Sequence, residues 1–238
     1  MSRTSDLAAA LDRLSQRLDD ACRAAGRNRD EVALLPVTKY FPASDVQILY
    51  DLGCREFGES REQEASVKVT EVHFANRVSW HMIGRLQRNK ARAVARWASS
   101  VHSVDSVRLA NALARGVAEA RDAGERSSAM RVFVQVSLDD DPSRGGIAAG
   151  DLIELADTVG GTSELELAGL MAIPPLGVEP DRAFSRLAEL QTLVTSVHPE
   201  ATGLSAGMSN DLEIAVRHGS TCVRVGTALM GPRPIISD

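Results

Sequence analysis

The sequence predicts an α/β fold, a (β/α)8 barrel of the TIM type, with one extra helix at the N-terminal side. About eight strand-like segments alternate with helical ones, a pattern that indicates a parallel sheet. The first strand is not followed by a glycine-rich dinucleotide turn, so an open, doubly wound sheet is the second choice. The 238 residues contain no linker or low-complexity tract, and a single domain over 1–238 is expected.

The expected elements follow one another in a regular order. A leading helix is predicted over 6–25, because apolar residues recur there on one stripe at helical spacing. Ser44 is expected to cap the helix after the first strand. The strands are predicted at 33–39, 54–60, 78–84, 100–105, 130–138, 165–173, 202–209 and 221–230. Helices are predicted between them at 45–52, 61–76, 87–98, 106–123, 149–159, 180–197 and 210–219.

Composition and charge argue against several classes of function. Hydrophobic residues make up 44% of the chain and charged residues 25%, which suits a packed core. The net charge of −5 argues against nucleic-acid binding. No apolar run suits a bilayer, and the acidic, amphipathic N-terminal segment is unlike a signal or transit peptide. Three isolated cysteines and scattered histidines predict neither a disulfide framework nor a metal site. We expect a cytoplasmic protein without membrane partners, a monomer or weak dimer.

The first predicted strand ends unusually, because the run ALLPVTKYF places Lys39 after buried-type residues. Of the 27 Lys and Arg residues, only three are lysines: Lys39, Lys68 and Lys90. A lysine kept in an arginine-rich chain suggests a role that Arg cannot fill, such as a Schiff base with an aldehyde. The simpler interpretation of Lys39 is a solvated strand end. Lys68 falls in a polar helical segment, and no special role is expected for it.

Polar residues after the last two strands predict a phosphate site. In a barrel, the C-terminal strand ends form the functional face, and phosphate often binds after strands 7 and 8. Gly207 lets the backbone approach a ligand, and Ser209 precedes a helix whose first amides are free. Gly226 and Thr227 offer the same combination, although each loop alone also suits an ordinary turn or cap. A lysine opposite a phosphate cradle suits an aldehyde that carries a phosphate, and pyridoxal 5′-phosphate is the obvious candidate.

Segments spread over most of the chain resemble, in order and spacing, the pyridoxal phosphate homeostasis protein family. They are VTKYFPASDV, FGES, WHMIGRLQRNK, VHSVD, GLMAIPP, LSAGMSND and GSTCVRVGTALMGPR. This family has the fold of the alanine racemase N-terminal barrel. The resemblance implies that Lys39 forms the internal aldimine with the cofactor and that Arg224 meets its pyridine nitrogen. The implied phosphate contacts are Ser209, Gly226 and Thr227, with Met208 lining the same loop.

Departures from the family pattern affect the expected site. The family usually has GEN after the second strand and this chain has GES, so Ser60 replaces an asparagine on the ring side of the cofactor. LSAGMS replaces LSMGMS at Ala206, and a lysine usual near the fifth strand is here Arg144. His81, at the end of the third strand, is counted among the cofactor-binding residues, either as a hydrogen-bonded wall residue or as a substitute base.

Three functions are compatible with these residues: a carrier of the cofactor, a pyridoxal phosphate-dependent enzyme such as an amino-acid racemase, and an enzyme that uses Lys39 on a sugar phosphate. A racemase of this kind needs a second domain that supplies a tyrosine base. The tyrosines here are Tyr40, expected to face away from the cofactor, and Tyr50, expected in the core. A charged arginine at the pyridine nitrogen also restrains carbanion chemistry. A carrier that controls the free cofactor, without robust catalysis, is therefore favoured, as the resemblance implies.

A basic segment over 85–96 stands out in this acidic chain. A solvated helix face is the simpler interpretation. A docking site for apo-enzymes that depend on pyridoxal phosphate, or a second phosphate site, is the alternative. Its cations are Arg85, Arg88, Lys90, Arg92 and Arg96.

Overall fold

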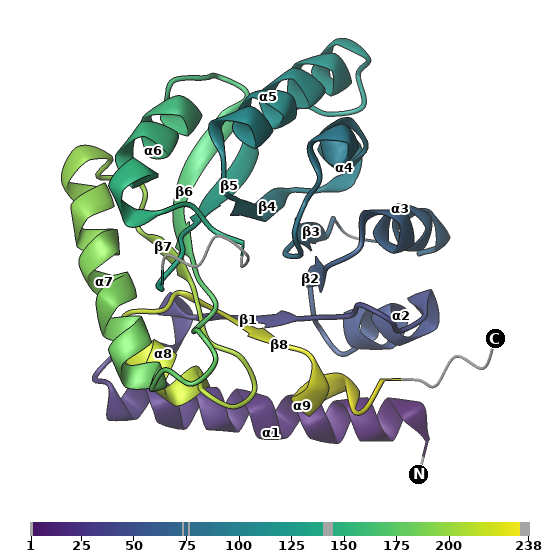
Figure 1. Ribbon diagram of the computed structural model, residues 1–238. Helices are drawn as coiled ribbons and strands as arrows, with labels where there is room; N and C mark the ends of the chain where they lie inside the picture. Colours follow the sequence, from purple (N-terminus) through teal and green to yellow (C-terminus); the bar gives the residue numbers. More distant parts are fainter. Residues whose placement is uncertain (1, 73, 76, 140–144, 234–238) are drawn as a thin grey trace.

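The computed structural model describes residues 2–72, 74–75, 77–139 and 145–233, and Figure 1 shows strands surrounded by helices. The strands are β1 (Ala33–Pro36), β2 (Glu56–Glu59), β3 (Ser79–Met82), β4 (Ser100–Val104), β5 (Met130–Gln135), β6 (Leu165–Met171), β7 (Gly203–Ser205) and β8 (Cys222–Val225). The α-helices are α1 (Arg3–Ala24), α2 (Ala43–Asp51), α3 (Glu62–Glu71), α4 (Ala91–Trp97), α5 (Val107–Asp122), α6 (Leu152–Gly160), α7 (Pro180–Val197), α8 (Leu212–Arg217) and α9 (Thr227–Met230).

The strands form a closed parallel barrel. Their order in the sheet is β1-β8-β7-β6-β5-β4-β3-β2, and every recorded pairing is parallel. The two ends of the sheet meet through a parallel bridge between Val37 and Gly58, where the Thr38 amide also donates to the Gly58 carbonyl at 3.0 Å. The C-terminal ends of the strands therefore gather at one mouth, where barrel proteins place their sites. The predicted (β/α)8 barrel with a leading helix is confirmed.

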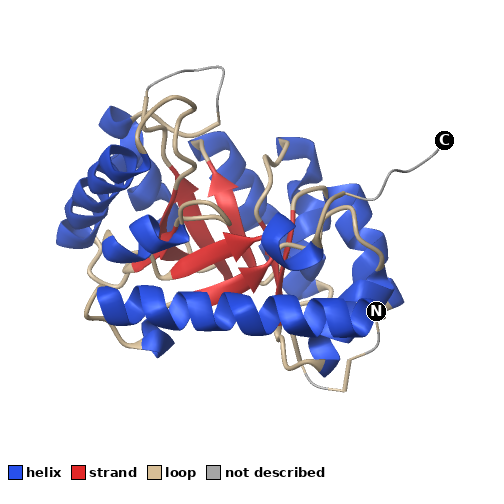
Figure 2. Cartoon of the chain, turned by 90° about the horizontal axis from the view of Figure 1, so that it is seen from below, coloured by secondary structure: helices blue, strands red, loops and turns tan. Residues whose placement is uncertain are grey.

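Helix α1 stands outside the repeating βα units and packs along the outer surface of the barrel. Figure 1 shows it beneath α8 and α9, and Figure 2 shows it as the long helix that crosses in front of the strands. Its buried side chains Leu7, Leu14 and Leu18 share one apolar cluster with Leu212 of α8 and Leu229 of α9. The predicted apolar stripe of this helix is therefore what attaches it to the barrel.

Some predicted boundaries are wrong for local reasons. Helix α2 begins at Ala43 after Pro42, so Ser44 lies inside the helix and does not cap it. Strand β8 ends at Val225, because Gly226 leaves the extended conformation with φ −105° and ψ −81°. The short helix α9 then occupies what was predicted as the end of that strand. Strand β7 likewise covers only the first part of its predicted range, and the loop that follows it belongs to the mouth.

The apolar interior lies between the strands and the surrounding helices. One large cluster of buried residues is contributed mainly by β3 to β6 with α4 to α7, and a second mainly by β8 with α1, α2, α8 and α9. Within the described residues, no helix combines the length and the apolar character needed to cross a membrane.

Candidate functional site

Lys39 follows β1 at the mouth of the barrel. Its side chain is half-buried and, within the described ranges, makes no hydrogen bond or ion pair. Its Nζ lies 6.0 Å from the centroid of the Tyr40 ring. Tyr40 has a φ of 70°, the one positive value among the described non-glycine residues, a conformation that costs about 1–2 kcal/mol. The Tyr40 amide donates to Glu64 Oε1 at 2.5 Å. Lys39 is thus presented on a strained turn, a feature that clusters at functional sites.

A buried charged cluster adjoins this turn. Lys68 of α3 is only 4% exposed and donates to the Thr38 carbonyl at 2.9 Å, to Glu59 Oε1 at 2.6 Å and to Glu64 Oε1 at 3.1 Å. The Thr38 hydroxyl donates to the same Glu59 oxygen at 2.6 Å. Burial raises the pKa of Glu59, although Lys68 opposes this effect. The expectation that Lys68 has no special position is wrong, because it binds the backbone that carries Lys39.

The loops after β7 and β8 meet each other, and the loop after β8 lies beside the residue that follows β1. The Ser209 hydroxyl accepts a hydrogen bond from the Ala228 amide at 3.4 Å, so the two loops are in direct contact. Gly226 lies against Val37, the residue that follows β1, because a Cβ atom placed on Gly226 would be 3.6 Å from Val37 Cβ. The two loops that the sequence singles out are therefore brought together, and Gly226 contacts Val37, which precedes Lys39 by two residues.

Unused backbone donors lie between these loops. The amide of residue 224 donates to the Gly207 carbonyl on the β7 side at 2.9 Å. Because backbone directions alternate along a strand, the Gly226 amide, two residues further on, points to the same side. In the described part of the chain, the Gly226 and Thr227 amides make no hydrogen bond. Thr227 is exposed and Ser209 is half-buried, so both hydroxyls are accessible from the mouth.

The turn that carries Ser209 is shaped by a residue that the sequence analysis missed. Asp211 is 9% exposed, and its Oδ1 accepts the Met208 amide at 2.6 Å. Helix α8 begins only after Asp211, so Ser209 lies in the turn and is not the helix cap. Gly207 has a φ of 90°, and a Cβ there would lie 2.6 Å from Ala215 Cβ. The glycine is therefore required by its backbone conformation and by the close approach of α8.

Arg224 lies inside the barrel at the end of a buried polar chain. It is 5% exposed, and it donates to Ser205 Oγ at 2.7 Å and to the Ala172 carbonyl at 3.0 Å. Ser205 Oγ lies 2.8 Å from His102 Nδ1, and His102 Nε2 lies 3.0 Å from His81 Nδ1. The structure thus places His81 in the interior, two side chains away from Arg224. His102 and Ser205 were missed, because nothing in their spacing shows that they meet across the barrel.

His81 and His102, the two histidines of this buried hydrogen-bonded row, are neutral at neutral pH. Burial lowers the pKa of His81 to about 4 and the pKa of His102 well below its usual value. His81 Nε2 is buried without a hydrogen-bond partner among the described residues, and Glu56 Oε1 lies 4.0 Å from it. A carboxylate there favours the tautomer with its proton on Nε2. His81 Nδ1 then accepts from His102, and His102 accepts from the Ser205 hydroxyl, which leaves a Ser205 lone pair for Arg224.

Ser60 lies at the edge of the mouth, after β2. Its backbone touches that of Gly84, where an added Cβ would lie 2.2 Å from the Ser60 carbonyl oxygen. Together with Arg61 and Arg85, Ser60 lines a groove of about 440 Å³. Ala206 is buried at 1% exposure, in agreement with a packing change at that position. Arg144 lies outside the described residues.

The basic segment divides into two parts. Lys90, Arg92 and Arg96 form ion pairs with acidic residues of α3, of α5 and of the turn after α5. The partners are Glu62 at 3.3 Å, Glu119 at 2.6 Å and Glu125 at 3.1 Å, respectively. Arg85 and Arg88 are exposed and have no ion pair within the described ranges. Only the part nearest the mouth therefore keeps uncompensated positive charge.

Comparison with known proteins places the chain in a family. The family described as "Alanine racemase, N-terminal domain" matches residues 10–234. The "Pyridoxal phosphate homeostasis protein" of Mycobacterium tuberculosis is 53% identical over 247 residues, covering 99% of this chain and 96% of the relative. This chain belongs to the pyridoxal phosphate homeostasis protein family. The family resemblance seen in the sequence is therefore confirmed.

Solved structures agree with this assignment. The structure of PipY from Synechococcus elongatus PCC7942, which has pyridoxal phosphate bound, superposes with a TM-score of 0.80 at 32% identity, covering 94% of this chain and 100% of that one. Alanine racemase from Corynebacterium glutamicum matches with a TM-score of 0.69 at 14% identity, covering 99% of this chain and 62% of the racemase. The second match supports the fold alone, and it confirms the barrel as alanine racemase-like.

Proposed function

We propose that this protein binds pyridoxal 5′-phosphate covalently through Lys39 and serves in intracellular homeostasis of the cofactor. The observation that carries the proposal is the unpaired, half-buried Lys39 at the mouth, beside two loops with unused donors. When bound, the cofactor supplies an aldehyde that condenses with a lysine amine. The PipY relative that holds pyridoxal phosphate supports the same ligand here. We place the protein in the cytoplasm as a single barrel domain over 1–238, a monomer or weak dimer.

The phosphate is assigned to the loops after β7 and β8. Ser209 and Thr227 each offer a hydroxyl, and the Gly226 and Thr227 amides have no other hydrogen-bond partner in the described chain. Hydroxyl and amide donors of this kind suit a dianionic phosphate better than a neutral group. Met208, 37% exposed in the same turn, lines this position.

The ring side of the cofactor is assigned to the barrel interior. Arg224 uses two nitrogens for Ser205 and Ala172, so the buried polar chain fixes its guanidinium plane. Its remaining N–H groups suit the lone pair of an unprotonated pyridine nitrogen. Ser60 is assigned to the ring side at the mouth, and His81 contributes through the chain that holds Arg224.

The residues near the mouth favour a carrier without robust catalysis. A racemase needs a free base close to the reacting carbon. Tyr40 stacks against Arg61 and Arg233, whose guanidinium carbons lie 4.8 Å and 4.4 Å from its ring centroid. Tyr50 is buried at 8% exposure in the core, and His81 is neutral and enclosed. These positions support storage and release of the cofactor over racemase activity, which is the second candidate.

Apo-enzymes that depend on the cofactor are the proposed protein partners. The uncompensated Arg85 and Arg88 border a groove of about 640 Å³ that also includes Asp105 at the end of β4. This places positive charge beside the mouth from which the cofactor leaves, which suits an acidic partner surface.

Titration tests the proposed ligand directly. Wild-type protein and the Lys39→Ala variant are mixed with pyridoxal phosphate, and the visible absorbance of the lysine-bound cofactor is followed. Wild type is expected to saturate at one cofactor per chain, and Lys39→Ala to give no such signal. Lys90→Ala serves as the control, because Lys90 already pairs with Glu62. An equal signal from wild type and Lys39→Ala would refute the proposal.

A further inference from the structure

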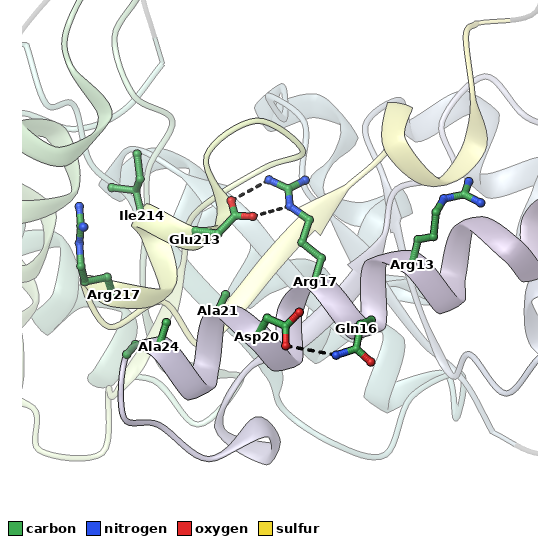
Figure 3. Close-up of a pocket in the computed structure, with 10 residues that line it drawn as sticks. Arg13, Gln16, Arg17, Asp20, Ala21, Ala24, Glu213, Ile214 and Arg217 are labelled. Atoms are coloured by element: carbon green, nitrogen blue, oxygen red, sulfur yellow. Dashed lines mark hydrogen bonds and ion pairs between the residues drawn. The ribbon is translucent and has the colours of Figure 1, made fainter.

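A side chain of helix α1, Arg17, reaches the proposed phosphate loop after β7. Its Nη1 donates to the carbonyl oxygen of Ser209 at 2.7 Å. Its Nε and Nη2 donate to the two carboxylate oxygens of Glu213 at 2.5 Å and 2.7 Å. Figure 3 shows this pair crossing between α1 and the segment that contains α8. A helix that lies outside the barrel repeat thus touches the loop that carries the Ser209 hydroxyl.

The guanidinium is fixed on both sides, which makes the contact specific. Bidentate pairing with a carboxylate sets the plane of an arginine fork. The third nitrogen is then aimed at the Ser209 carbonyl from a fixed direction. The hydrogen bond to Arg17 also lowers the pKa of Glu213, so this pair stays ionised at neutral pH. Asp211, two residues before Glu213, holds the other end of the same turn through the Met208 amide.

We propose that Arg17, oriented by Glu213, is a positioning residue for phosphate binding: it holds the Ser209 turn so that the Ser209 hydroxyl faces the Gly226 and Thr227 amides. This inference rests on the proposed function, since it assumes that these loops bind phosphate. It gives α1 a role beyond burial of its apolar stripe, because the helix then sets the geometry of a phosphate site to which it contributes no donor of its own.

A second arginine in the same region provides a matched control. Arg27, just after α1, donates to the carbonyls of Val216 at 3.0 Å and Ser220 at 2.6 Å, and it pairs with Glu31 at 3.0 Å. It therefore ties the N-terminal helix region to the end of α8 that lies away from Ser209. Both arginines combine a carboxylate partner with backbone carbonyls, but only Arg17 reaches the proposed phosphate loop.

The experiment compares Arg17→Lys, Glu213→Gln and Arg27→Lys with wild type. A lysine keeps the positive charge but cannot make the bidentate pair that arginine makes with a carboxylate. The dissociation constants of pyridoxal phosphate and of pyridoxal are measured for each protein, together with the thermal midpoint. Arg17→Lys is expected to weaken pyridoxal phosphate about tenfold, the effect of losing one good hydrogen-bond geometry. Pyridoxal, which has no phosphate, is expected to change less than about twofold by the same reasoning.

The controls separate positioning from a general loss of structure. Arg27→Lys is expected to lower the thermal midpoint and leave the pyridoxal phosphate constant unchanged. Glu213→Gln is expected to weaken pyridoxal phosphate less than Arg17→Lys, and it replaces that variant if the latter does not fold. Equal weakening of both ligands by Arg17→Lys, or no weakening of either, would overturn the inference while wild-type binding stands. Failure of wild type to bind pyridoxal phosphate would refute the proposed function itself.

Discussion

The lysine side and the phosphate side of the barrel mouth are held in place by different means. On the lysine side, the backbone of Thr38 is bound by Lys68, which lies with Glu59 in a buried ion pair. On the phosphate side, the Ser209 turn is held from outside the barrel by Arg17, which is 35% exposed. Buried charge is costly to disturb, whereas exposed pairs contribute little to stability. Changes on the lysine side should therefore cost stability, and changes on the phosphate side should cost affinity.

The largest effect is expected for Lys68→Met, which leaves the Glu59 carboxylate buried without its partner. Removing one member of a buried pair typically costs about 3–5 kcal/mol. Arg92→Met removes a cation from the exposed pair with Glu119, in which the two side chains are 69% and 52% exposed, and it should cost less than about 1 kcal/mol. Urea unfolding of the two variants gives the comparison. Equal losses would show that the lysine side is not built on buried charge.

The buried hydrogen-bonded row that contains His81 makes the free energy of unfolding depend on pH. The pKa of His81 is about 4 in the folded protein, against an ordinary value of 6.5, so the folded state binds fewer protons. The contribution of neutral His81 to the free energy of unfolding is therefore complete above pH 6.5 and is lost as the pH falls toward 4. The loss from His81 is about 3 kcal/mol. Between pH 6.5 and pH 4, the free energy of unfolding should fall more steeply with decreasing pH for wild type than for His81→Gln. Identical slopes would contradict the lowered pKa of His81.

The phosphate side should respond in affinity with little change in stability. Ser209→Ala and Thr227→Val each remove one hydroxyl from the proposed cradle, and each should weaken pyridoxal phosphate about tenfold. Pyridoxal should bind poorly to wild type and change little in the variants. The unfolding free energy should stay within about 0.5 kcal/mol of wild type, as for most surface substitutions. If pyridoxal weakens as much as pyridoxal phosphate, these residues do not hold the phosphate.

The smallest expected effect concerns the strained turn on the lysine side. Tyr40→Gly and Tyr40→Ala both remove the ring, but only glycine adopts a positive φ without a steric cost. Tyr40→Gly should therefore be the more stable of the two by about 1 kcal/mol. Denaturant unfolding of the pair isolates the backbone contribution. A more stable Tyr40→Ala would mean that the turn relaxes and stores no strain.

The barrel and the principal residues of the mouth could be predicted from sequence, because their signals are local. The alternation of strand-like and helical segments predicts the fold, and the predicted strand ends indicate Lys39 and the loop at Gly226. The remaining parts depend on which side chains meet across the interior or from another element. Nothing near Lys68 in the sequence shows that it points inward, and Arg17 lies 192 positions from Ser209.

The covalent attachment site tests the account most directly. The purified protein is saturated with pyridoxal phosphate, reduced with borohydride, digested and mapped by mass spectrometry. We predict that the cofactor mass is fixed on the peptide that contains Lys39, even though Lys68 and Lys90 are also present. Lys68 is enclosed by three acceptors and Lys90 pairs with Glu62, whereas Lys39 has no such partner in the described chain. A label found mainly on Lys68 or Lys90 would contradict the assignment of Lys39 as the residue that holds the cofactor.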